Sequence, residues 1–211
     1  MADYIFNEAD NAWADLLLTH GASEPVDSAF LTTMAEGLAA HGVRTARFEF
    51  DYLAQVRRGG SRRPPPKMPV LEEEFRARIA TYERSRPLFI GGKSMGGRVS
   101  SLIADDMVSA GQIAGIICLG YPFHPVGKPE KLRTAHLKDL SAPALVCQGT
   151  RDPFGTTEDV AGYELSDQIE IEWLEDGDHS FKPRKRSGVT LEQNMAQAID
   201  ASVRFMTRHA S

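Results

Sequence analysis

The chain has 211 residues, 42% of them hydrophobic, and a net charge of −5, an ordinary composition for a globular protein. This length suits one domain with a sizeable core, and we expect a single domain over residues 1–211. The negative charge argues against general nucleic-acid binding, and no apolar run approaches the roughly 20 residues that span a bilayer. The first residues, MADYIFNEAD, lack the basic and apolar pattern of a secretory signal, so we expect a cytoplasmic protein without membrane partners.

Short apolar runs alternate with helical patterns along the chain. The predicted strands are residues 13–20, 43–50, 87–92, 113–122, 142–150 and 169–175. The predicted helices are residues 27–42, 71–85, 95–111, 156–165 and 190–210. A loop rich in Arg, Gly and Pro precedes the second helix. This order predicts an α/β fold with a mostly parallel sheet of about six to seven strands and helices on both faces.

The segment PLFIGGKSMGGR contains two overlapping motifs. Its GKS resembles the end of a phosphate-binding loop, but that loop requires a glycine where this chain has Pro87, and a strand occupies the place of the loop. The next strand also ends without an acidic residue that could hold magnesium. The same letters, GKSMG, form Gly-x-Ser-x-Gly, which marks a nucleophile on a tight turn between a strand and a helix. Gly92 and Gly96 leave the space that such a turn needs around Ser94.

Gly-x-Ser-x-Gly alone is a weak indication, so the positions of an acid and a histidine decide its meaning. Active sites of parallel sheets lie at the carboxyl ends of the strands. Asp152 and His179 each follow a predicted strand there, in the chain order nucleophile, acid, histidine. We therefore predict that Ser94, Asp152 and His179 form a catalytic triad. A turn aspartate and a surface-loop histidine are the alternatives, each common singly but not together at matching strand ends.

The segments LLLTHGAS, GGKSMGGR, CQGTRDPFG and DGDHSF together resemble the α/β-hydrolase superfamily, in its small, capless, dienelactone-hydrolase-like type. They are most similar to the family that includes hydrolase-like subunits of the chromatin-acetylating NSL complex and testis-expressed hydrolase-like proteins. The resemblance covers residues 3–209 and implies the fold and the triad, but no particular substrate. True dienelactone hydrolases carry cysteine where this chain has Ser94, so their substrate is not carried over.

The implied mechanism is acyl transfer through Ser94 with water as the second substrate and with no metal or organic cofactor. The oxyanion hole would use the backbone N–H of Met95 at a helix N-terminus. The family pattern His-Gly-x supplies a second N–H from Ala22, with Gly21 allowing close approach of the backbone. His20 is expected to be a structural loop histidine rather than a second base.

Several residues near these strand ends are candidates for the substrate pocket. Tyr52 and His124 follow strands and are predicted to line it together with Gly21. Lys93 is expected to pack its stem at the strand end with its charge near solvent or a carboxylate. The alternative for Lys93 is that its charge tunes the triad.

Two basic segments, residues 57–67 and 182–186, belong on the active-site side of the sheet. They are either solvated loops or a positive rim that attracts a small anionic acyl substrate. The interval 122–143 is too short for a sizeable cap, so we expect an open site. The sequence does not separate an esterase from a thioesterase, amidase or lactonase. A non-catalytic scaffold or binding module is the alternative function.

Overall fold

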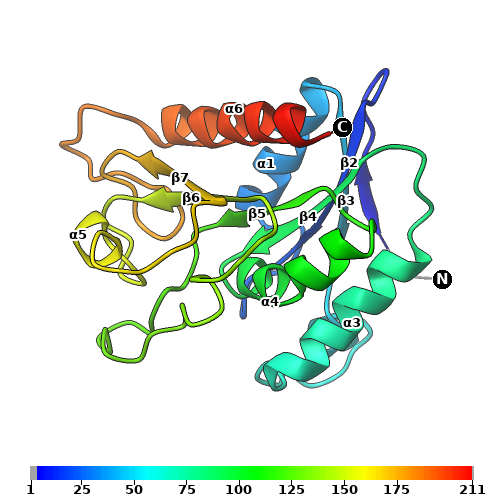
Figure 1. Cartoon of the computed structure of the whole chain (residues 1–211), viewed down its shortest axis with the longest axis horizontal. Coiled ribbons are helices and arrows are strands. Elements are labelled where there is room, and N and C mark those ends of the chain that lie inside the picture. The colour runs from blue at the N-terminus through cyan, green and yellow to red at the C-terminus, as the bar shows by residue number, and fades with distance from the viewer. Residues whose placement is uncertain (1–3, 211) are drawn as a thin grey trace.

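The computed structural model describes residues 4–210. These residues are built around one seven-stranded sheet (Figure 1). The strand order is β1-β3-β2-β4-β5-β6-β7, with β1 antiparallel to β3 and all other neighbours parallel. The strands are β1 (Ile5–Asn7), β2 (Ala14–Thr19), β3 (Val43–Phe48), β4 (Leu88–Lys93), β5 (Gly115–Leu119), β6 (Ala144–Gly149) and β7 (Ile169–Leu174). The helices are α1 (Ala29–Ala40), α2 (Asp51–Arg57), α3 (Met68–Thr81), α4 (Met95–Ser109), α5 (Thr157–Val160) and α6 (Leu191–His209). The predicted α/β class is confirmed.

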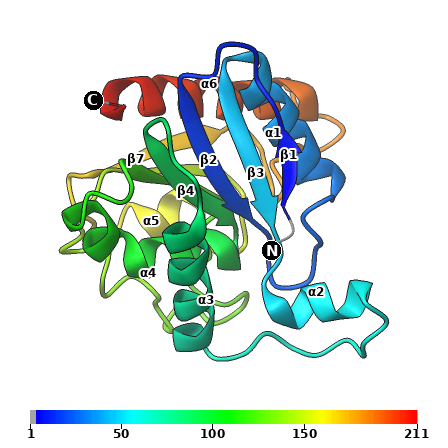
Figure 2. The same ribbon diagram turned by 90° about the vertical axis from the view of Figure 1, so that its right-hand side faces the viewer.

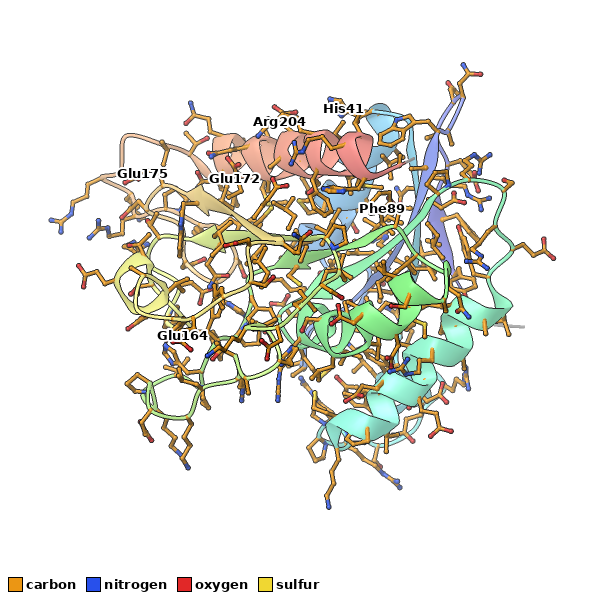
Figure 3. All side chains as sticks on the ribbon, viewed as in Figure 1. His41, Phe89, Glu164, Glu172, Glu175 and Arg204 are labelled. Carbon is orange, nitrogen blue, oxygen red and sulfur yellow. The ribbon has the colours of Figure 1, made fainter. Side chains whose placement is uncertain are left out.

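Helices cover both faces of the sheet, α1 and α6 on one side and α3 and α4 on the other (Figures 1 and 2). Because side chains of a strand alternate between faces, Leu17 packs in the core on the α3 and α4 side, whereas Leu16 packs in the core beneath α1 and α6. Phe89 lies between the sheet and α6 (Figure 3), with its ring centroid 6.2 Å from that of Phe205. Burial on both faces explains why the central strands read as continuous apolar runs.

Two elements were not predicted, β1 and α2. β1 has only three residues and two of them are exposed, which is too short for a period of two to show in the sequence. α2 lies where we expected a loop to begin, and it buries only Tyr52 and Leu53. α3 also begins three residues before the predicted helix, with Pro69 in its first turn, where proline is tolerated.

Side chains cap the N-termini of the first and last helices. Ser28 caps α1, its side chain accepting from the backbone N–H of Leu31. Thr190 begins α6 in a capping box with Gln193. Cys118 and Cys147 are buried free thiols, and burial raises the pKa of both.

The carboxyl ends of the parallel strands are left without a cap. Residues 120–143, which connect β5 to β6, form turns and contain no helix or strand. Among residues 4–210, none of the helices combines the length and apolarity needed to cross a membrane. The edge of the sheet that carries the candidate site is covered by connecting loops and by the short helices α2 and α5, which follow β3 and β6.

Candidate active site

Ser94 is the single residue between β4 and α4, and its backbone conformation is strained. Its φ is 51° and its ψ is −110°, outside the regions that residues with a side chain prefer. Such a conformation costs on the order of 1–3 kcal/mol and persists only where the surrounding structure holds it. Here the N–H of Ser94 donates to the carbonyl of Leu119 at 2.9 Å, and its own carbonyl accepts from the N–H of Arg98 at 3.0 Å. Strand and helix thus fix the turn from both sides.

The glycines around this turn let strand and helix meet backbone against backbone. A Cβ on Gly92 would lie 2.6 Å from the carbonyl carbon of Gly96. A Cβ on Gly96 would lie 2.7 Å from the side chain of Thr19 and 2.8 Å from the carbonyl oxygen of His20. Atoms do not approach so closely without displacement, so both positions require glycine. The close approach of strand and helix that the motif predicts is therefore present in the structure.

Asp152 and His179 form a hydrogen-bonded pair at the ends of β6 and β7. His179 Nδ1 lies 2.7 Å from Asp152 Oδ2, and the aspartate is fully buried. Asp152 Oδ1 also accepts from the N–H of Phe154 at 2.9 Å, and its Oδ2 accepts from Gln148 Nε2 at 3.0 Å. The ring of Phe154 packs on the imidazole with centroids 4.3 Å apart. A carboxylate facing Nδ1 places the proton on that nitrogen and leaves Nε2 as the acceptor.

Ser94 and His179 line one cavity of about 290 Å³. Its other lining residues are Gly21, Ala22, Ser23, Glu24, Lys93 and Phe154. Met95 is the first residue of α4, where a backbone N–H has no acceptor within the helix. The structure therefore brings the predicted nucleophile, histidine and oxyanion loop to one place, with Asp152 held behind the histidine. Within residues 4–210, no group of three or more His, Cys, Asp or Glu side chains could hold a metal ion.

A family model described as "Alpha/beta hydrolase domain" matches residues 12–207. The chain belongs to the α/β-hydrolase family.

Solved hydrolase structures share this α/β-hydrolase fold over nearly the whole chain. A dienelactone hydrolase from Anabaena variabilis has a TM-score of 0.70 at 16% identity, over 100% of this chain and 98% of its own. Est1E from Butyrivibrio proteoclasticus has a TM-score of 0.67 at 13% identity, over 98% of this chain and 99% of its own. A serine hydrolase without lid from Xanthomonas campestris has a TM-score of 0.62 at 17% identity, over 95% and 84%. These likenesses establish the fold, and the predicted capless architecture is confirmed.

The loop after β2 in this α/β-hydrolase is held by two aromatic side chains. His20 is fully buried, accepts at Nε2 from the N–H of Phe50 at 3.1 Å, and therefore donates from Nδ1 to the carbonyl of Gly21 at 2.6 Å. Burial lowers the pKa of His20, which keeps the ring neutral. The hydroxyl of Tyr52 donates to the carbonyl of Ala22 at 2.9 Å. Both side chains position the loop that would carry the second oxyanion donor.

Tyr52 and His124, predicted to line the pocket, lie outside the lining of this cavity. The hydroxyl of Tyr52 donates its hydrogen bond to the Ala22 carbonyl. His124 is buried with Nδ1 2.9 Å from the carbonyl of Pro125 and Nε2 3.7 Å from Asp159 Oδ2. His124 thus shapes the connection between β5 and β6, whereas Gly21 does line the cavity.

Lys93 is buried, so its charge does not lie near solvent, the first of the two places expected for it, whereas the carboxylate of Asp152 does act on it. The residue is 2% exposed, and its Nζ donates to the carbonyl oxygen of His179. The ammonium also lies 5.0 Å from the ring centroid of Phe30 and 5.9 Å from that of Phe181. Burial lowers the pKa of Lys93 to about 8, against the opposing effect of Asp152. A buried cation therefore ties the end of β4 to the loop that carries His179.

The stability of the protein should change with pH through Lys93. Between a folded pKa of about 8 and the ordinary value of 10.5, the unfolded chain binds more protons at this residue, so stability rises with pH. Between about pH 7 and about pH 9.5, the free energy of unfolding of wild type should rise by about 2 kcal/mol relative to that of Lys93→Met. Urea unfolding of both proteins at each pH measures the difference. Lys185→Met, at an exposed position, should run parallel to wild type. Parallel profiles for Lys93→Met would show that the ammonium is not desolvated.

The basic segments are partly neutralised by acidic neighbours. Arg57 bonds both oxygens of Asp27, at 2.6 and 3.0 Å, and Glu49 at 2.7 Å. Arg184 forms an ion pair with Asp176. The positive rim is therefore weaker at these two positions than the sequence indicates.

Gln148 is a site residue that the sequence analysis missed. It is fully buried in β6, donates to Asp152 Oδ2, and accepts at Oε1 from the N–H of Tyr121 at 2.7 Å. Its Nε2 also lies 3.2 Å from the carbonyl oxygens of Tyr121 and Gly155. A polar side chain at the end of the apolar run PALVCQG was the available signal, because buried polar groups require partners.

Proposed function

We propose that this α/β-hydrolase is a serine hydrolase that cleaves acyl esters or thioesters through an acyl-enzyme on Ser94. One observation carries the proposal: a serine in a strained turn lines the same cavity as His179, whose Nδ1 is bonded to the buried Asp152. A scaffold would not need a strained serine, a histidine and a buried carboxylate at the same strand ends.

The mechanism follows from these positions. Ser94 Oγ attacks the acyl carbonyl while His179 Nε2 accepts its proton. The N–H groups of Met95 and Ala22 stabilise the oxyanion, and the imidazolium is stabilised by Asp152. Collapse of the tetrahedral intermediate expels the alcohol or thiol, which takes the proton from His179. Water, activated by the same imidazole, then releases the acid and restores Ser94.

The neighbours described as esterase domain and dienelactone hydrolase support hydrolysis of ester bonds. The absence of a cap favours a small, accessible acyl substrate over a long lipid that requires a closing lid. We further propose that the protein acts in the cytoplasm and belongs to the capless group that includes the NSL-complex and testis-expressed hydrolase-like proteins. No metal or organic cofactor enters the proposed reaction.

A fluorophosphonate probe tests the nucleophile directly. We expect covalent labelling of wild type, found by mass spectrometry on the peptide that contains Ser94. Ser94→Ala and His179→Ala should lose labelling, because one lacks the attacking oxygen and the other lacks the base.

Ser23→Ala is the matched control, since Ser23 lines the same cavity without a histidine partner in the proposed mechanism. It should be labelled like wild type. Absence of labelling on a folded wild-type protein would refute the proposed function and favour the scaffold.

A further inference from the structure

Two arginines beside the candidate nucleophile lack acidic partners. Arg98 belongs to α4, and Arg133 belongs to the connection between β5 and β6. Within the described part of the chain, neither guanidinium forms an ion pair or a hydrogen bond, and the Nε of Arg98 is buried without any acceptor. Arg57 and Arg184, by contrast, are matched by carboxylates. A buried guanidinium nitrogen without an acceptor is costly and requires an explanation.

The two arginines share one polar cluster between α4 and the connection from β5. The Oγ of Ser101 donates to the carbonyl of Arg98 at 2.8 Å and lies 2.8 Å from His136 Nε2. The hydroxyl of Tyr121 lies 3.3 Å from the same Oγ and 3.3 Å from the carbonyl of Arg133. These bonds reach the backbone carbonyls of the two arginines, and the charges of both guanidinium groups act on Tyr121. The bonded groups of the cluster include no carboxylate, and Asp105 acts on His136 only as a nearby charge.

The charges within this cluster repel one another. Burial and Arg98 lower the pKa of Arg133, and they lower the pKa of His136 to about 4, so His136 is neutral. The carboxylate on this face of α4, Asp105, accepts from the N–H groups of Ser141 and Ala142 and forms no ion pair with either arginine. An anion from outside would relieve the repulsion.

The backbone of Arg98 lies one helical turn from the proposed nucleophile, and neither arginine lines the cavity at Ser94 itself. The N–H of Arg98 donates to the carbonyl of Ser94, one helical turn earlier, and helical side chains lean toward the N-terminus. Arg133 donates through its N–H to the carbonyl of Phe123 at 2.7 Å, just beyond the end of β5. Since β2 and β5 flank β4 on opposite sides, the connection that carries Arg133 and the loop at Gly21 follow strands on opposite sides of the strand that leads to Ser94.

We propose that Arg98 and Arg133 bind a free carboxylate on the acyl chain of the substrate, so that the enzyme prefers monoesters of short dicarboxylic acids. Guanidinium groups match the geometry of a carboxylate with paired hydrogen bonds. This inference rests on the proposed function, and it names a substrate class for the same site. It also assigns anion recognition to these two arginines rather than to the basic segments.

The test compares mono-p-nitrophenyl succinate, glutarate and adipate with their methyl-capped neutral analogues, after subtraction of the enzyme-free rate. Wild type should show a higher kcat/KM for at least one acid than for its capped analogue. Arg98→Gln and Arg133→Gln should each reduce this ratio about 10- to 100-fold, the effect of losing a hydrogen bond to a charged group. Arg98→Lys and Arg133→Lys keep the positive charge but lose the paired donors of the guanidinium. They should retain part of the preference in kcat/KM for the acid over its capped analogue.

Arg63→Gln, at an exposed position in the basic segment, is the control and should leave the ratio as in wild type. Equal kcat/KM for acids and capped esters in wild type would overturn the inference. So would a ratio that is unaffected by both glutamine variants, or lost only in Arg63→Gln. Probe labelling of Ser94 separates the two proposals: labelling without acid preference refutes only this inference, whereas absence of labelling refutes the proposed function.

Discussion

Replacing Asp152 with asparagine should lower kcat for an activated ester about 10³- to 10⁴-fold while leaving the protein folded. The carboxylate accepts from Phe154 at one oxygen and from Gln148 and His179 at the other. An asparagine amide has only one acceptor oxygen, so its NH₂ group must face at least one of these donors. The negative charge that stabilises the imidazolium is lost in either orientation.

Steady-state kinetics on a neutral p-nitrophenyl ester and thermal unfolding measure the two parts of this expectation. Asp167→Asn is the matched control, because Asp167 is exposed and should change neither quantity. A folded Asp152→Asn variant with wild-type kcat would exclude Asp152 as the acid of the triad. An unfolded variant would be replaced by Asp152→Ser, which should show a comparable loss of kcat.

Gly92→Ala should destabilise the fold by about 3 kcal/mol or more, because the three atoms nearest the added Cβ all belong to the backbone. It would lie 2.6 Å from the carbonyl carbon of Gly96, 2.7 Å from its Cα and 2.9 Å from the nitrogen of Gly97. Flexible side chains can move away from a new methyl group, but these atoms belong to the first turn of α4. β4 cannot yield either, since β2 and β5 pair with it on both sides.

Urea unfolding of Gly92→Ala beside Gly188→Ala gives the measurement. A Cβ on Gly188 meets nothing within 4 Å, so that variant should stay within about 0.5 kcal/mol of wild type. Equal stability of the two variants would mean that the turn between β4 and α4 is looser than its contacts indicate.

Local patterns in the sequence were sufficient to predict the fold class. Apolar runs such as residues 142–150 indicate strands buried on both faces, and their alternation with helical segments leaves a parallel sheet as the natural arrangement. β1 escaped prediction because its three residues gain their structure from pairing with β3. α2 escaped because its position was read as the beginning of an Arg-, Gly- and Pro-rich loop.

The candidate triad was also predictable, because the carboxyl ends of parallel strands meet at one edge whatever the details of packing. Ser94, Asp152 and His179 each follow a strand, so their order in the chain carried the prediction. Their role in catalysis stays a prediction until Ser94 is tested.

The sequence by itself thus determined the order of the elements and the strand ends at which the candidate catalytic residues stand. Only the tertiary structure decided how the charges beside them are paired. Lys93 is buried against the carbonyl of His179, and Arg98 and Arg133 lie together without a carboxylate. Burial and ion pairing depend on distances between segments far apart in the chain, and no local periodicity encodes those distances.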